Sequence, residues 1–279
     1  MLTDKRLLRA DMHTHSDFSA DCHTPMEEIC RAELAVGTTV MANTDHCDIF
    51  RCSYMDVLSP LLAAREEVFR LREVYGDRLT VLSGVEIGEG FWFPETARLV
   101  ERAAEWDVII GSVHVVKYKG FIEPTAQYRF ADFSDEDAEG YVDAYFDDMM
   151  TMLESRDIDV LAHLTYPWRY VEGFGGKRLD KARFDERIDR VLERVIRRGI
   201  ALEVNTAYYD MMRETTPNAE ILSRYRVMGG RLITLGSDAH FGKNASLCFD
   251  EALSMLDSLG FQKVYYYQNR KPVACPIKQ

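Results

Sequence analysis

The stretch Asp107-Val-Ile-Ile-Gly-Ser-Val-His114 is a short apolar run that ends in a histidine. The same arrangement recurs at Ile158-Asp-Val-Leu-Ala-His163, and Val81-Leu-Ser-Gly-Val-Glu86 ends in a carboxylate instead. Short apolar runs of this kind are typical of buried strands. The strand ends of one parallel barrel converge on one face, where scattered side chains can meet. These stretches therefore predict a parallel barrel with a shared site at one end.

Apolar runs alternate with amphipathic stretches along the chain, which is the pattern of βα units on a parallel sheet. We expect strands near 8–13, 38–43, 79–85, 107–113, 158–162, 200–204 and 231–236, and a weaker one at 263–267. We expect helices at about 25–36, 60–75, 94–105, 134–156, 180–198, 217–229 and 244–258. Pro60 is expected at a helix start, and Ser134 and Asn244 as N-caps. No repeat or linker divides the chain, so residues 1–279 are expected to form a single α/β domain.

Two long segments between these elements lack periodicity. The first, 118–135, is expected to form an extended loop over the strand ends that acts as a substrate lid. The second, 166–179, contains three glycines and the basic residues Arg169, Lys177 and Arg178.

Composition excludes several classes of protein. The chain has 34 Lys plus Arg against 46 Asp plus Glu, a formal charge of -12, and no long basic block, which argues against an extended nucleic-acid partner. The sequence has no apolar run long enough to span a membrane and no secretory signal at its start, so a soluble, cytoplasmic protein is expected. The six cysteines form no CxxC pair, and reduced thiols are expected.

Imidazole and carboxylate side chains are concentrated at the expected strand ends. His13 and His15 are two residues apart and share one face of a strand, as do Asp238 and His240. Each residue alone has an ordinary interpretation as a core side chain, but the set is too rich in such groups for ordinary packing. The plausible metal ligands are His13, His15, Asp21, His46, Glu86, His114, His163, Asp238 and His240. Because one ion uses about four ligands, this set predicts two or three divalent ions, with zinc, manganese and iron all suited to it.

The order DxHxH, TDH, GxE, SVH, a lone AH and SDAH resembles the polymerase-and-histidinol-phosphatase (PHP) superfamily, and its spacing is similar to the histidinol-phosphatase branch. The resemblance covers roughly residues 8–265 and implies a distorted, TIM-like (β/α)7 barrel with a trinuclear site. It implies that one ion is held by His13, His15, Glu86 and Asp238, a second by Glu86, His114 and His163, and a third by Asp21, His46 and His240. Asp11, Asp45 and His23 would then support these ligands or take no part.

The resemblance implies hydrolysis of a small phosphomonoester, with L-histidinol phosphate, from histidine biosynthesis, as the first candidate. A hydroxide bridging two ions would attack phosphorus in line, and Asp238 or His240 would protonate the leaving group. Arg169 stands where this branch tends to carry a phosphate-binding arginine. A second such arginine is replaced by Asp210, and Arg213 is the nearest residue that could bind the same phosphate.

Two alternatives stay open at this point. One is a phosphoesterase of the same family with another substrate, such as a different sugar or metabolite phosphate, a nucleotide or a short oligonucleotide. The other is a non-catalytic metal-binding module, which a metal content below two ions per chain would favour. The oligomeric state is also open, and a homo-oligomer is possible.

Overall fold

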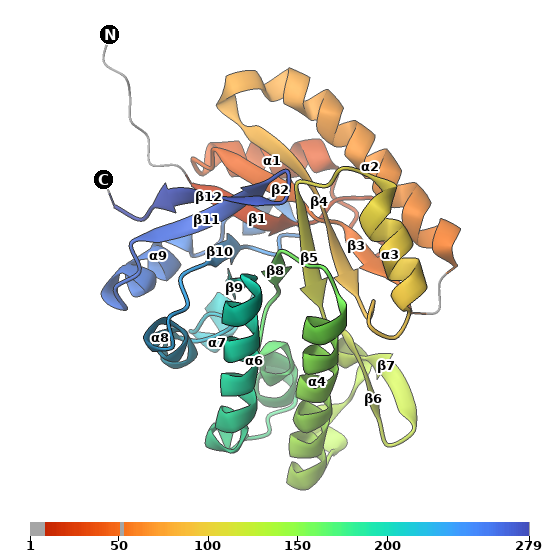
Figure 1. Cartoon of the computed structure of the whole chain (residues 1–279), viewed down its shortest axis with the longest axis vertical. Helices are drawn as coiled ribbons and strands as arrows, with labels where there is room; N and C mark the ends of the chain where they lie inside the picture. The colour runs from red at the N-terminus through yellow and green to blue at the C-terminus, as the bar shows by residue number, and fades with distance from the viewer. Residues whose placement is uncertain (1–8, 51–52, 279) are drawn as a thin grey trace.

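The computed structural model describes residues 9–50 and 53–278, and its centre is a ring of parallel strands (Figure 1). In sheet order these strands are β1 (Ala10–Thr14), β2 (Val40–Asn43), β4 (Thr80–Gly88), β5 (Val108–Ser112), β8 (Val160–Leu161), β9 (Ala201–Asn205) and β10 (Ile233–Gly236). A short strand, β3 (His46–Asp48), pairs with the far end of β4. The ring closes where the Asp238 amide donates to the His13 carbonyl at 2.7 Å and the His15 amide donates to the Ala239 carbonyl at 3.0 Å. The expected seven-stranded barrel in a single domain is therefore confirmed.

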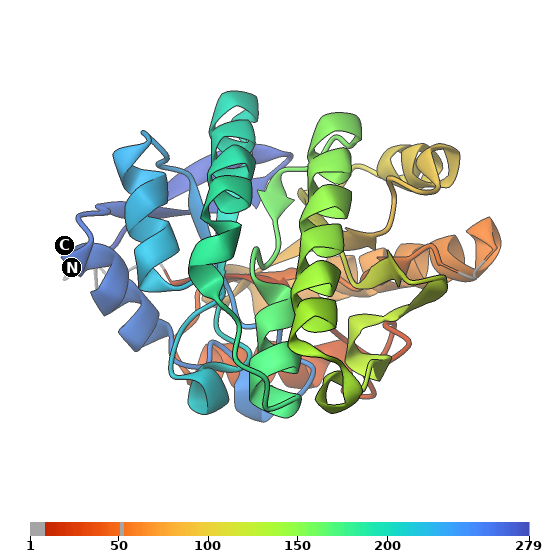
Figure 2. The same ribbon diagram turned by 90° about the horizontal axis from the view of Figure 1, so that it is seen from below.

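Helices alternate with the barrel strands and cover the outside of the ring (Figures 1 and 2). They are α1 (Met26–Ala35), α2 (Tyr54–Tyr75), α3 (Pro94–Ala103), α4 (Asp135–Ser155), α6 (Asp185–Arg198), α8 (Ala219–Val227) and α9 (Phe249–Ser258). The short helices α5 (Tyr166–Trp168) and α7 (Tyr209–Met212) follow β8 and β9, and a π-helical turn (Arg169–Phe174) continues α5. Among the described residues, no helix combines the length and apolarity needed to span a membrane.

Side-chain alternation on the strands divides the core into an inner and an outer layer. Val108 and Ile110 of β5 pack inside the ring, and Ile109 between them packs against the helices. Tyr267 joins the inner layer from the antiparallel hairpin of β11 (Lys263–Gln268) and β12 (Lys271–Pro276). The weaker strand expected at 263–267 is thus present, but it belongs to this hairpin and not to the barrel.

Several expected boundaries were wrong for local reasons. Helix α2 begins at Tyr54 because Ser53 and Asp56 form a capping box, which leaves Pro60 inside the helix. Asn244 lies in a 3₁₀ turn, and α9 begins only at Phe249. The N-cap at Ser134 is confirmed, since its hydroxyl accepts the Asp137 amide.

The segment expected to be an extended loop is partly regular. It contains most of an antiparallel hairpin, β6 (Val115–Tyr118) and β7 (Phe121–Pro124). Residue 8, the first of the expected strand 8–13, lies outside the described residues.

Candidate metal centre and anion pocket

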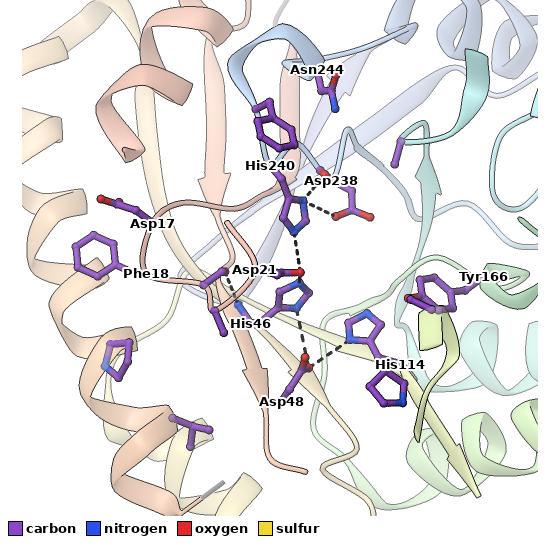
Figure 3. A pocket seen from close by; sticks show the side chains of 18 of the residues that line it. Asp17, Phe18, Asp21, His46, Asp48, His114, Tyr166, Asp238, His240 and Asn244 are labelled. Carbon is purple, nitrogen blue, oxygen red and sulfur yellow. Dashed lines mark hydrogen bonds and ion pairs between the residues drawn. The ribbon is translucent and has the colours of Figure 1, made fainter. Parts of the chain in front are cut away.

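A cavity of about 1110 Å³ lies at the carboxyl ends of the barrel strands (Figure 3). Its wall is built from the segments that follow β1, β2, β5, β8, β9 and β10. Each of these segments contributes at least one lining residue, namely Asp21, His46, His114, Tyr166, Tyr208 and His240. Gln127, from the segment expected to be a lid, also lines it. The strand-end residues singled out in the sequence therefore do converge on one space.

Glu86 is the centre of this convergence. Its Oε2 lies 3.2 Å from His13 Nε2 and 2.9 Å from His46 Nδ1. Its Oε1 lies 3.2 Å from His114 Nε2 and 3.1 Å from His163 Nε2. The carboxylate is fully buried among these four imidazoles, so its two oxygens face two different sets of nitrogen donors. This is the geometry that a carboxylate bridging two cations requires.

Asp238 lies beside the imidazoles of His13, His15 and His240. Its Oδ1 lies 3.3 Å from His15 Nε2, 3.9 Å from His13 Nε2 and 3.7 Å from His240 Nδ1. Asp21 lies between the two outermost imidazoles, with its Oδ2 3.5 Å from His46 Nε2 and 3.3 Å from His240 Nε2 (Figure 3). All nine residues predicted as ligands are thus brought together.

The donor spacing suits cations but does not follow the expected grouping in every detail. Three sets place all their donor atoms within 4.8 Å of one another: His13, His15 and Asp238; His46, Glu86 and His114; and His15, His46 and His240. His15 therefore belongs to two sets, and His46 stands beside Glu86 as well as beside Asp21. The family resemblance implied that each of these histidines belongs to one ion.

Buried atoms without hydrogen bonds test whether cations fit here. Nε2 of His13 and His15, Nδ1 of His46 and Oε2 of Glu86 are buried and form no hydrogen bond. Buried polar atoms normally have a partner, and a partnerless one is costly. Because imidazole and carboxylate are the ligands that zinc, manganese and iron accept, bound divalent cations would supply what these atoms lack.

The pKa values of the cluster show which of its groups are ready to bind cations and which would first lose a proton. Burial, with help from the neighbouring His46 and His240, lowers the pKa of His15 to about 3, so this imidazole is neutral. Burial alone would raise the pKa of Glu86, but His13, His114 and His46 hold it well below its ordinary value. A neutral imidazole and an ionised carboxylate are the protonation states that bind metal. Burial alone would lower the pKa values of His13, His46 and His114, but the neighbouring carboxylates raise them, so bound cations would have to displace protons from these three imidazoles.

Two carboxylates that the sequence did not single out hold the ligands from behind. Glu203 on β9 lies 2.6 Å from His13 Nδ1, opposite the nitrogen that faces the cluster. A Cβ on Gly236 would come within 2.2 Å of the Glu203 carboxylate, so this glycine makes the contact possible. Asp48 Oδ1 lies 3.3 Å from His114 Nδ1. Carboxylates in this position fix the orientation of a ligand imidazole.

The remaining polar candidates have structural partners. Asp45 accepts hydrogen bonds from the Ser16 amide and hydroxyl and from the Ser19 hydroxyl, each at 2.7 Å, and thereby anchors the loop after β1. Asp11 accepts from the amides of His13 and Ser237, both at 3.1 Å, which ties β1 to β10. His23 is exposed and outside the cavity wall.

The backbone at two ligand positions is strained. His163 has a φ of 47° and Asp238 a φ of 54°, in the left-handed region that residues other than glycine seldom adopt. Such conformations persist where the surrounding structure enforces them and are concentrated at functional sites. Here they turn two side chains towards the cluster directly after strands β8 and β10.

The two arginines considered for phosphate binding lie in different environments. Arg169 is 6% exposed and lines the cavity, as does Tyr208. Arg213 ends helix α7 on the surface and is not part of the cavity wall, and Asp210 is likewise exposed.

Comparisons with known proteins agree with this geometry. The family model described as PHP domain matches residues 11–207. A probable histidinol-phosphatase of Clostridium acetobutylicum is 28% identical over 92% of this chain and 96% of its own length. A histidinol-phosphatase of Lactococcus lactis subsp. lactis is 26% identical over 94% of this chain and 96% of its own.

Solved structures show the same fold. Histidinol phosphate phosphatase of Lactococcus lactis subsp. lactis, in complex with zinc, L-histidinol and phosphate, matches 96% of this chain and 100% of its own, with a TM-score of 0.78 and 24% identity. A putative histidinol phosphatase of Listeria monocytogenes matches 87% of this chain and 99% of its own, with a TM-score of 0.73 and 19% identity.

Proposed function

Because the chain belongs to the PHP domain family and aligns with histidinol-phosphatases over nearly its whole length, we propose that it hydrolyses L-histidinol phosphate to L-histidinol and phosphate. The observation that carries the proposal is the cluster around Glu86, where five imidazoles meet one buried carboxylate and several buried atoms lack hydrogen bonds. The enzyme is a metal-dependent phosphatase, and its reaction belongs to histidine biosynthesis.

The nine clustered side chains would hold two or three divalent cations, of which zinc, manganese and iron suit the donors. When bound, these cations would neutralise phosphoryl oxygens and lower the pKa of a coordinated water molecule. The shared position of Glu86 supports at least two neighbouring sites. Its Oε2 faces His13, His15 and His46, and its Oε1 faces His114 and His163.

Side chains of this chain would bind the phosphoryl group and protonate the leaving group. Arg169 donates hydrogen bonds to the phosphoryl oxygens, for which a guanidinium is well shaped. Asp238 is the weaker candidate for protonating the leaving alkoxide, because neighbouring His13 and His15 outweigh its burial and hold its pKa well below its ordinary value. Burial alone would lower the pKa of His240, but Asp21 and Asp238 raise it, so His240 is the better proton donor by charge.

Phosphate release from purified protein loaded with zinc or manganese tests the proposal. L-histidinol phosphate should give the highest kcat/KM in a panel that includes a sugar phosphate, a nucleoside monophosphate and a dinucleotide. Absence of turnover on L-histidinol phosphate, with metal confirmed by elemental analysis, would overturn it. Turnover confined to another member of the panel would keep the phosphoesterase and change its substrate.

Two arginine variants separate the phosphate-binding candidates. Arg169→Met should lower kcat/KM by about 10- to 100-fold, the size of a lost charge-assisted hydrogen bond. Arg213→Met should have a smaller effect, because Arg213 is exposed outside the cavity wall. A larger effect at Arg213 would reassign the phosphate contact.

A further inference from the structure

Among the described residues, no carboxylate contacts the buried guanidinium of Arg169, and Asp238 acts on it only from farther away. The side chain of Arg169 lines the cavity, and the residue is only 6% exposed. Nη2 makes one long hydrogen bond, 3.4 Å to the Tyr170 hydroxyl, and Nε has no hydrogen-bond partner. Within the described residues, no carboxylate oxygen lies within 4.0 Å of its guanidinium. A buried charge normally needs a paired ion, so this pocket is built to receive an anion from outside the chain.

Aromatic rings replace the missing ion pair. The guanidinium carbon lies over the rings of Tyr166 and Tyr208, 4.2 Å from each centroid, and 5.1 Å from the centroid of Tyr170. An arginine can stack on ring faces while its N–H groups still point outward in the guanidinium plane, which a lysine ammonium cannot do. The rings therefore fix the plane of Arg169 without using up its donors.

The two closest rings differ in how firmly they are held. Tyr166 is buried and stacks on His163, with centroids 4.9 Å apart and planes inclined by 27°, so the barrel fixes it. Tyr208 comes from the loop between β9 and α7 and is half-buried. Its ring packs edge-on against the ring of Phe174, with the two centroids 5.9 Å apart, and Phe174 is itself exposed.

We infer that Tyr208 is a positioning residue for anion binding: its ring holds the Arg169 guanidinium so that the free N–H edge meets the oxygens of a phosphoryl group. The inference rests on the proposed function for the identity of the natural ligand, but the anion subsite itself is defined by Arg169 and its rings. Tyr208 acts through Arg169 and needs no contact of its own with the phosphoryl group.

Calorimetry with inorganic phosphate and the metal-loaded protein tests this directly. Tyr208→Leu should weaken phosphate binding by about tenfold, the size of a desolvated cation–π contact. Tyr208→Phe keeps the ring and should recover most of that loss. Tyr209→Leu is the matched control, since the neighbouring tyrosine is outside the cavity wall and should leave the phosphate affinity unchanged.

A double-mutant cycle separates positioning from general structural support. In an Arg169→Lys background the ring has no guanidinium to hold, so Tyr208→Leu should change phosphate affinity by less than about twofold. An equal loss in both backgrounds, or a Tyr208→Leu protein that binds phosphate as tightly as wild type, would overturn the inference. If thermal melting shows that Tyr208→Leu is unfolded, Tyr208→Met takes its place in the cycle.

The phosphate measurements are independent of the substrate. Weaker phosphate binding in Tyr208→Leu, together with a wild-type protein that does not hydrolyse L-histidinol phosphate, would support the anion subsite and remove the proposed function. Unchanged phosphate binding in Tyr208→Leu, with a wild-type protein that hydrolyses L-histidinol phosphate, would overturn the role of Tyr208 and support the proposed function.

Discussion

The two ends of the barrel both bury carboxylates but treat them in opposite ways. At the amino end, Asp107 precedes β5 and accepts from Arg72 Nη2 at 2.6 Å, the Ser83 amide at 3.0 Å and the Asn269 amide at 3.0 Å. At the carboxyl end, Glu86 Oε2 is buried and accepts no hydrogen bond. The first carboxylate has its donors within the chain, whereas the second has one such partner, His163, and leaves its other oxygen to a ligand.

This difference separates stability from function along the same strands. A carboxylate with an arginine and two amides joins neighbouring elements, as Asp107 joins α2, β4 and the β11–β12 hairpin. Glu86, surrounded by imidazoles, has His163 Nε2 3.1 Å from its Oε1 but keeps its buried Oε2 without a hydrogen bond. The general tendency of such barrels to carry chemistry at the carboxyl ends and stability at the amino ends is therefore visible in the partners of two acidic side chains.

The largest effect should come from removing the charge at the carboxyl end. Glu86→Gln should lower kcat by about 10³-fold, equivalent to about 4 kcal/mol, because two sets of imidazoles lose their shared anion. Elemental analysis should show less bound metal than in wild type. Glu105→Gln, at an exposed position, is the control. Wild-type metal content and wild-type kcat in Glu86→Gln would show that the carboxylate at the carboxyl end is not needed for function.

The converse change at the amino end should affect folding alone. Asp107→Ala leaves Arg72 and two amides without their acceptor and should lower the free energy of unfolding by about 3 kcal/mol. Denaturant titration measures this loss. The kcat on L-histidinol phosphate should stay within about twofold of wild type, since Asp107 lies at the opposite end of β5 from His114. A large loss of kcat in a folded variant would show that the ends are coupled.

A smaller effect is expected behind the metal ligands. Glu203→Gln weakens the contact that orients His13 and should reduce metal affinity by about 10- to 100-fold, as for other carboxylates that support ligand imidazoles. Competition with a chelator gives this affinity without an activity assay. Metal affinity equal to wild type would mean that Glu203 only fills space beside Gly236.

The smallest effect concerns the pH dependence of the metal-free protein. Burial, and then the nearby Asp48 carboxylate, raise the pKa of Glu89 to about 8. The folded state then holds a proton that the unfolded chain has already released above its ordinary pKa of 4.5, so stability should fall as pH rises towards 8, by about 1 kcal/mol between pH 7 and 8, and level off above that. The wild type should show this slope more strongly than Glu89→Gln in denaturant titrations. Identical slopes would contradict the raised pKa.

Much of the barrel could be predicted because its strands are apolar runs bounded by turns. The strand expected at 107–113 is β5, and the histidine that follows it lies in the cavity wall. The short strand β3 was missed because three residues give no periodicity. The weaker strand at 263–267 was placed without its partner because antiparallel pairing depends on contacts that local pattern does not encode.

In the site, the sequence could name the side chains that converge but not the carboxylates that support them. Asp48 lies two residues after His46, on the same face of β3, and this spacing was the signal that could have found it. Glu203 gave no such signal, because it contacts His13 only after β9 and β1 have been placed. The stacking of tyrosine rings on Arg169 could not be predicted either, since the rings come from segments that meet only in the folded barrel.

The seam that closes the ring also determines how early in synthesis the clustered side chains can meet. Hydrogen bonds at the seam join β1 to the segment after β10, and cation donors lie on both sides of it. On the ribosome, His13 and His15 emerge early, and Asp238 and His240 only after most of the chain has been made. Because the cluster needs side chains from both sides of the seam, a growing polypeptide can complete it only after translation has delivered β10 and the segment that follows it.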